Sequence, residues 1–246
     1  MWTLWFSLLF LLWAPTSDGA ELNTDVLSLI VSDFRPEAVT EDENGRPTDR
    51  QFAFLMALTP TECRNRNVFG GYFPPGIRGT VTPSIKYNTA NSLNHPRLNY
   101  MAVFPHTGEQ CSEYKLLYLT DDDRNLGINT IAAQSFQNKL HARKMTVGCV
   151  IFYTRNTPCI RNCFSGNQNC EIVSPLSGSP FNTAWGNQNI GKYFVFSEVF
   201  RRDNNPESIR IIREKLQQIK GAGFIIRRCD GNQIQCQDCN APDYCV

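Results

Sequence analysis

Two short cysteine-containing segments carry the residue types that could do chemistry. They are Cys111-Ser112-Glu113 and Pro158-Cys159-Ile160-Arg161-Asn162-Cys163. Cys159 and Cys163 are four residues apart, so on one helical turn their Cβ atoms would lie about 5–6 Å apart and both thiolates could bind one zinc ion. Cys111 would supply the third ligand. Three protein ligands leave the fourth position of zinc for water, which is the arrangement of a catalytic site.

Glu113 is the candidate for proton transfer. It follows Cys111 by two residues, and on a regular helix the two side chains would point about 200° apart, so they can share a site only where a helix begins. The sequence places both at such a start, between a predicted strand and a predicted helix. A carboxylate beside a zinc-bound water can take its proton and deliver it to a ring nitrogen and to a leaving amine.

Strands and helices alternate along the chain around these segments. Apolar runs predict strands over 80–87, 99–104, 146–153, 193–200 and 224–226. Helical spacing and capping residues predict helices over 26–34, 113–119, 131–140 and 206–220, with two more starting at Thr48 and at Thr157-Pro158. The stretches 41–49 and 164–191 are interpreted as a linker and a loop. This alternation is typical of an α/β sandwich.

The cysteine count leaves other interpretations open. Ten cysteines indicate an oxidising compartment, where a cysteine is usually half of a disulfide. Glu113 could be an ordinary first-turn carboxylate, and His106 could replace Cys111 as a ligand. Cys149, mid-strand among apolar residues, is expected to be an unpaired thiol. The remaining cysteines form the expected disulfide set, whose connectivity stays open: Cys63, Cys170, Cys229, Cys236, Cys239 and Cys245.

The amino-terminal residues predict export. Residues 1–13 are almost entirely apolar, and small residues suited to peptidase cleavage follow, so residues 1–19 are interpreted as a signal peptide. No run reaches the roughly 20 apolar residues that a membrane span needs. We therefore expect a secreted protein. The 24 basic and 23 acidic residues give a formal charge of +1, which by itself indicates no polyanionic partner.

With these residues in place, the chain resembles the zinc-dependent nucleobase deaminases. Their signature is His or Cys, any residue, Glu, and later Pro-Cys with a second Cys close behind. The stretch 193–226, with Val195-Phe196-Ser197-Glu198-Val199-Phe200, a charged loop, a helix and Ala222-Gly223-Phe224, is similar to the carboxy-terminal half of the AID/APOBEC catalytic domain. With the export signal, the chain resembles the secreted AID/APOBEC-like deaminases of fish.

The resemblance implies a fold and a site. The fold would be a cytidine-deaminase-like α/β/α sandwich with a central mixed sheet of about five strands, preceded by amino-terminal helices and followed by a disulfide-stapled tail. Zn²⁺ would be held by Cys111, Cys159 and Cys163. Glu113 would shuttle protons. The residues implied to bind substrate are Phe200, Arg201 and Arg202 in the loop that selects the neighbouring nucleotide, and Asn156 just before Pro158-Cys159.

The same resemblance implies an activity. The protein would be a hydrolase acting on carbon–nitrogen bonds of cyclic amidines, converting cytosine to uracil by attack of zinc hydroxide on C4. The substrate would be single-stranded DNA, RNA or free cytidine. The alternative is a catalytically inactive secreted binding or defence protein on a deaminase-like fold. The sequence leaves the oligomeric state open.

These interpretations divide the chain into four segments. The signal peptide (1–19) precedes amino-terminal helices with a first strand and loops (20–98). The zinc deaminase core spans residues 99–228, and a cysteine-rich tail covers residues 229–246.

Overall fold

The computed structural model describes most of the chain after residue 19. The described residues are 20–34, 39–41, 47–49, 51–69, 99–103, 111–119, 124–125, 127, 129–165, 171–187, 189–239 and 245–246. The predicted signal peptide and the strand expected over 80–87 therefore lie outside the described residues, as do His106 and Cys170.

A mixed six-stranded sheet forms the centre of the protein, in the order β4-β3-β5-β6-β7-β8. The strands are β3 (Ala53–Leu58), β4 (Tyr100–Val103), β5 (Cys149–Asn156), β6 (Gly191–Glu198), β7 (Ile225–Asp230) and β8 (Gln235–Asp238). β5 pairs with β6, and β6 with β7, in parallel, whereas the other neighbours are antiparallel. The expected strands in the second half of the chain are thus confirmed.

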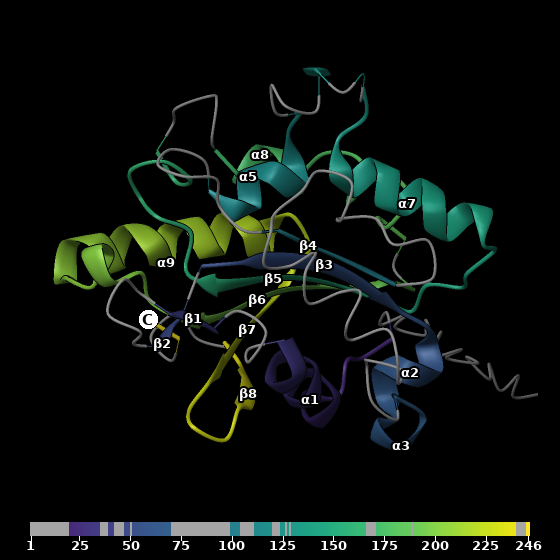
Figure 1. Cartoon of the computed structure of the whole chain (residues 1–246), viewed down its shortest axis with the longest axis horizontal. Coiled ribbons are helices and arrows are strands. Elements are labelled where there is room, and N and C mark those ends of the chain that lie inside the picture. The colour runs from purple at the N-terminus through teal and green to yellow at the C-terminus, as the bar shows by residue number, and fades with distance from the viewer. Residues whose placement is uncertain are drawn as a thin grey trace, which may run out of the picture.

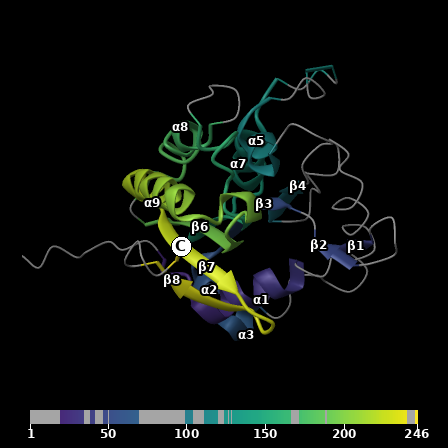
Figure 2. The ribbon, with the colours of Figure 1, turned by 90° about the vertical axis from the view of Figure 1, so that its left-hand side faces the viewer.

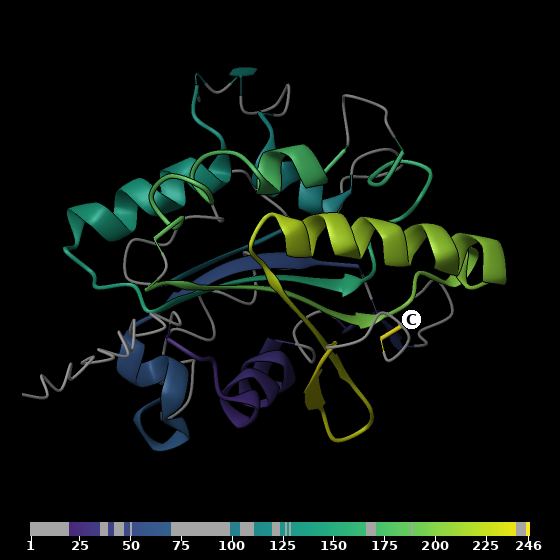
Figure 3. The ribbon, with the colours of Figure 1, turned by 180° about the vertical axis from the view of Figure 1, so that it is seen from behind.

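Helices cover both faces of this sheet (Figure 1). One face carries α5 (Ser112–Leu117), α7 (Ala132–Ala142), α8 (Val173–Leu176) and α9 (Pro206–Gly221), and the other carries α1 (Thr24–Phe34), α2 (Pro60–Arg64) and α3 (Arg66–Phe69). The turned views show the two helical layers separated by the sheet, with α9 on the same side as α7 and α8 (Figures 2 and 3). The expected α/β/α sandwich is therefore confirmed.

The alternation of side chains along β3 explains why both faces are covered. Phe54 and Met56 pack into the apolar cluster that includes α1, whereas Ala53, Leu55 and Ala57 belong to the cluster beneath α5, α7 and α9. Successive residues of a strand point to opposite faces, so a strand with apolar residues at every position must be buried on both. All six residues of β3 are buried.

The prediction of a helix that starts at Thr48 is wrong. Thr48 lies in β2 (Pro47–Asp49), which pairs with β1 (Val39–Glu41) in place of the expected polar linker, and Phe52 precedes β3. Phe52, Leu55 and Met56 fit helical spacing, but they belong to an apolar run from 52 to 58 without the polar face that a helix at a surface requires. A run of this length is the pattern of a strand buried on both sheet faces.

The helix expected at Thr157-Pro158 is also absent. The hydroxyl of Thr157, expected to cap that helix, instead accepts a hydrogen bond from the backbone N–H of Phe200, at 3.0 Å. Cys159 and Cys163 lie on a single turn, in which the N–H of Cys163 donates to the carbonyl of Cys159 at 2.9 Å. By contrast, the helix expected at Asn205-Pro206 is confirmed, and the Asn205 side chain caps it by accepting from the N–H of Ser208 at 3.0 Å.

The carboxy-terminal tail is cross-linked by disulfides, as expected, and it also extends the sheet. Cys229 of β7 lies opposite Cys236 of β8 and is bonded to it, and a second disulfide joins Cys239 to Cys245. Cys245 is buried in the same core as α9. β8 thus makes the sheet six-stranded where the sequence predicts about five strands.

Cys149 is not the unpaired thiol that the sequence predicts. It forms a disulfide with Cys63, which ends up beside it because α2 directly follows β3, and Leu58 of β3 pairs with Cys149 of β5. Both sulfurs are fully buried in the core on the α1 side of the sheet. An apolar position therefore accommodates a disulfide as well as a free thiol.

No described helix is long and apolar enough to pass through a bilayer.

The Cys63–Cys149 disulfide closes a loop with a sequence separation of 86, against 7 for Cys229–Cys236. Chain entropy in the unfolded state then predicts that replacing the first pair by alanine lowers the free energy of unfolding by about 2 kcal/mol more than replacing the second pair. Urea denaturation of the two double variants measures the difference. Equal losses, or a non-reducing peptide map without the Cys63–Cys149 link, would contradict this assignment.

Candidate active site

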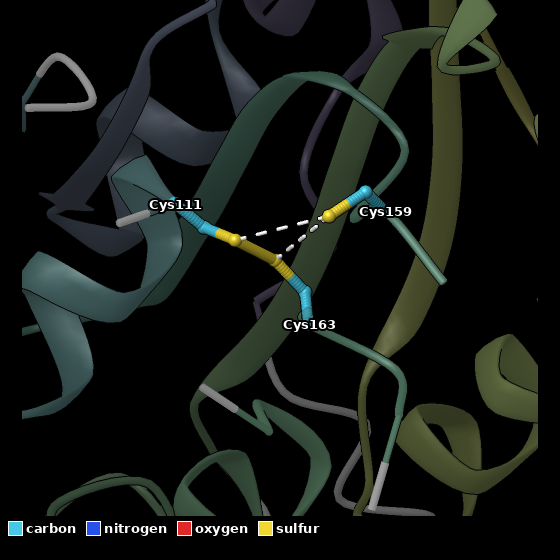
Figure 4. Close-up of side chains that lie close together, drawn as sticks. All are labelled: Cys111, Cys159 and Cys163. Atoms are coloured by element: carbon cyan, nitrogen blue, oxygen red, sulfur yellow. Dashed lines mark hydrogen bonds between the residues drawn. A yellow bond between two sulfur atoms is a disulfide. The ribbon is translucent and has the colours of Figure 1, made fainter. Parts of the chain in front are cut away.

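The two cysteine segments meet beside the end of β5 (Figure 4). Cys111 is the residue immediately before α5, and its side chain makes no capping hydrogen bond to that helix. Cys159 and Cys163 occupy the turn that follows β5. Cys111 precedes Cys159 by 48 residues, and the fold brings it into one cluster with Cys159 and Cys163, as the sequence predicts.

The three sulfur atoms lie within 4.8 Å of one another. Cys159 Sγ is 3.9 Å from Cys111 Sγ and 3.8 Å from Cys163 Sγ. Cys111 and Cys163 are joined as a disulfide, and Cys159 is the free cysteine of the described residues. The cluster offers a set of ligands that could hold a metal ion once that disulfide is reduced, because a thiolate is the form of cysteine that binds metals.

Glu113 lies beside this cluster with almost no exposure, at 1%. Ser112 Oγ donates to Glu113 Oε2 at 3.1 Å, and Gln51 Nε2 donates to Glu113 Oε1 at 3.0 Å. The hydroxyl of Thr154 also contacts Oε1. Burial raises the pKa of Glu113, and the hydrogen bonds from Thr154, Ser112 and Gln51 act in the opposite direction. Its burial and these three partners distinguish Glu113 from an exposed first-turn glutamate.

Gln51 and Thr154 are the two site residues that the sequence analysis missed. Gln51 falls within the helix predicted to start at Thr48, whereas it is the second residue before β3 and its amide donates to Glu113. Thr154 is a fully buried polar residue within the apolar strand β5. Gln51 directly precedes an apolar run and Thr154 directly follows one. A polar residue in such a position is the signal in the sequence that could have identified both.

The environment of Cys159 disfavours an isolated thiolate. Burial raises the pKa of Cys159, the backbone N–H groups of Cys163 and Asn162 lower it, and the charges of Glu113 and Asp203 raise it further. Two carboxylates thus lie close enough to Cys159 to affect its ionisation. A positive charge beside this sulfur, such as that of a bound cation, would favour the thiolate.

The loop expected to bind substrate lies next to the cysteine turn. It comprises Phe200, which is partly exposed, and Arg201 and Arg202, which are exposed in the short 3-10 helix η3 (Arg201–Asp203). Besides the Phe200–Thr157 contact, Asp203 Oδ2 accepts from the backbone N–H of Ile160 at 2.9 Å. The loop after β6 is thereby tied to the turn after β5.

Asn156, the fourth residue expected to bind substrate, ends β5. Its backbone N–H donates to Gln51 Oε1 at 3.0 Å, and its carbonyl accepts from Thr154 Oγ1 at 2.9 Å. The backbone of Asn156 thus belongs to the same network as Glu113.

The protein has a deaminase-like α/β architecture. This class is defined by the mixed sheet, by the helical layer on each of its faces, and by the cysteine cluster beside a buried glutamate. The sequence model of a family described as Secreted Novel AID/APOBEC-like Deaminase 1 matches residues 24–244, and the chain belongs to this family. No curated protein and no solved structure matches the chain. The family match begins with α1 and reaches into the cysteine-rich tail, so it includes both regions outside the stretch 99–228 that carries the resemblance.

Replacing Asp203 by alanine should loosen the turn that carries Cys159. The variant loses a charge-assisted hydrogen bond to Ile160 N–H, which predicts a loss of about 1 kcal/mol in the free energy of unfolding and faster hydrogen exchange at Ile160. Urea denaturation and amide exchange measured by NMR test both effects. The control is Glu214→Ala, which removes an exposed ion pair within α9 and should change neither quantity appreciably. Unchanged exchange at Ile160 would contradict the contact.

Proposed function

We propose that the protein is a secreted zinc-dependent hydrolytic deaminase that converts cytosine to uracil in single-stranded DNA or RNA or in free cytidine. The observation that carries this proposal is the cluster of three cysteine sulfurs within 4.8 Å beside the buried carboxyl group of Glu113, in a member of a deaminase family. Neither feature alone indicates deamination. Together they supply the ligands and the proton carrier that this reaction needs.

The chemistry and spacing of the cysteines fit zinc. Two thiolates on one tetrahedral zinc, each at about 2.3 Å, are about 3.8 Å apart. Cys159 Sγ lies at 3.9 and 3.8 Å from the sulfurs of Cys111 and Cys163. When bound, the metal supplies a Lewis acid and lowers the pKa of a water in its open position. The Cys111–Cys163 disulfide and the metal-bound state exclude each other, because the same sulfurs serve both.

Glu113 is the proposed proton carrier. Its carboxylate would accept a proton from the attacking water and pass it to N3 of the pyrimidine and then to the departing ammonia. Burial raises its pKa, which brings the carboxyl group closer to the neutral pH at which it must both accept and donate. The hydrogen bonds from Ser112 and Thr154 hold it in one orientation.

The loop beside the cysteine turn is proposed to bind the nucleotide. The ring of Phe200 would stack on a base, and the exposed guanidinium groups of Arg201 and Arg202 would contact phosphates. Asn156 is proposed to contact the target base. The ties from Thr157 and Asp203 keep this loop beside Cys159, which supports a shared site.

Secretion is proposed from two observations. The family description contains the word secreted, and the described residues hold four disulfides, as expected for an oxidising compartment. Residues 1–19 are proposed as the export signal that the mature protein lacks.

Zinc content tests the first half of the proposal. Full-length protein reduced with a phosphine and dialysed against zinc should hold one metal ion per chain, and Cys159→Ser should lose it because only two thiolates remain. The matched control is the Cys229→Ser and Cys236→Ser double variant, whose cysteines lie on the other side of the sheet and should not affect zinc. Elemental analysis measures the content. A wild-type protein without zinc, with Cys111 and Cys163 still bonded after this treatment, would favour the inactive binding protein instead.

Replacement of Glu113 tests the second half. Glu113→Gln keeps the shape of the side chain but cannot carry the proton, so cytosine conversion should fall by about 10²–10⁴-fold while zinc content stays the same. A screen of single-stranded DNA, RNA and cytidine with wild type and variant measures the loss and names the substrate. Glu214→Gln, on the exposed face of α9, serves as the control and should retain activity. Equal conversion by wild type and Glu113→Gln would remove this residue from the mechanism.

A further inference from the structure

Gln51 holds together three parts of the candidate site. Its side-chain amide is half-buried and reaches Glu113 at the start of α5, Thr154 within β5, and the backbone of Asn156 at the end of β5. These partners lie 62, 103 and 105 residues away along the sequence. The central position of β3, between β4 and β5, allows one side chain to reach all of them.

The orientation of this amide is fixed by its neighbour. The backbone N–H of Asn156 can only donate, so the group facing it at 3.0 Å must be the oxygen of Gln51. The nitrogen of Gln51 therefore faces the other way, where it donates to Glu113 Oε1 at 3.0 Å and to Thr154 Oγ1 at 2.8 Å. A flipped amide would place an acceptor against the carboxylate and a donor against an N–H.

This arrangement distinguishes the two oxygens of Glu113. Oε1 accepts from Gln51 Nε2, an amide nitrogen that can only donate, and it also contacts the Thr154 hydroxyl. Oε2 has the hydroxyl of Ser112 at 3.1 Å, and a hydroxyl can either donate or accept. Gln51 thus holds Oε1, whereas Ser112 faces Oε2.

We infer that Gln51 is a positioning residue that holds the Glu113 carboxyl group, through Oε1, in one orientation beside the cysteine cluster. This inference rests on the proposed deaminase function. Gln51 acts through Glu113 and the Asn156 backbone and contacts no reacting atom itself. Its role is to hold the α5 start and the β5 end in one geometry.

Two variants separate the contacts of Gln51. Gln51→Glu keeps an oxygen for the N–H of Asn156 but replaces the donor that faces Glu113, so deamination kcat should fall by about 10–100-fold with KM within about 2-fold. Gln51→Met removes both contacts, so it should also accelerate amide exchange at Asn156 by at least about 10-fold. Gln51→Glu should leave that exchange slow. Zinc content should be unchanged in both variants.

The control is Gln134→Met, because Gln134 lies on α7 and its amide donates to Gln137 and Asn138 away from the site. It should match wild type in kcat, KM and Asn156 exchange. An active wild type whose kcat is retained in Gln51→Glu and Gln51→Met overturns the positioning role while leaving the deaminase proposal intact. A zinc-loaded wild type that converts no cytosine overturns the deaminase function, and with it the role of Gln51 in positioning a proton carrier.

Discussion

β5 lies at the centre of the sheet, antiparallel to β3 and parallel to β6, and this placement determines the rest of the candidate site. Because both of its faces are covered, its apolar residues fix its register and its depth in the protein. Thr154 then lies beside Glu113, and the chain leaving the strand forms the turn that carries Cys159 and Cys163. The parallel partner β6 delivers the Phe200 loop to the same end of the sheet, where ligands of α/β folds commonly bind.

The buried carboxyl group at this end imposes its own requirement. An ionised carboxylate without partners is costly in a protein interior, so it must be hydrogen-bonded or neutral. Ser112, Thr154 and Gln51 meet this requirement from three different elements, and the remaining effect of burial is a raised pKa. Structure and proposed chemistry thus depend on the same contacts. The groups that make the burial of Glu113 tolerable also set its orientation.

Disulfide formation and the proposed metal binding use the same cysteine sulfurs in the cluster, so they exclude each other. Three disulfides stabilise the fold away from the cluster, where they join Cys63 to Cys149, Cys229 to Cys236 and Cys239 to Cys245. In the cluster, Cys111 and Cys163 can be bonded to each other or can be thiolates beside Cys159, but not both. An oxidising compartment favours the first state and a bound metal would favour the second, so metal loading and oxidation would compete at this site.

The sequence by itself determined the strands β4, β5, β6 and β7, the helices α5 and α7, and the capped helix α9. These features rest on local signals: apolar runs, caps and i, i+4 spacing. The tertiary structure alone decided the strand β3, the pairing of Cys149 with Cys63, and the contacts of Gln51 and Thr154 with Glu113. Each of these depends on which segment lies alongside another. A continuous apolar run does not state whether a sheet or a helix buries it, and an amide or hydroxyl reveals its partner only after distant strands have paired.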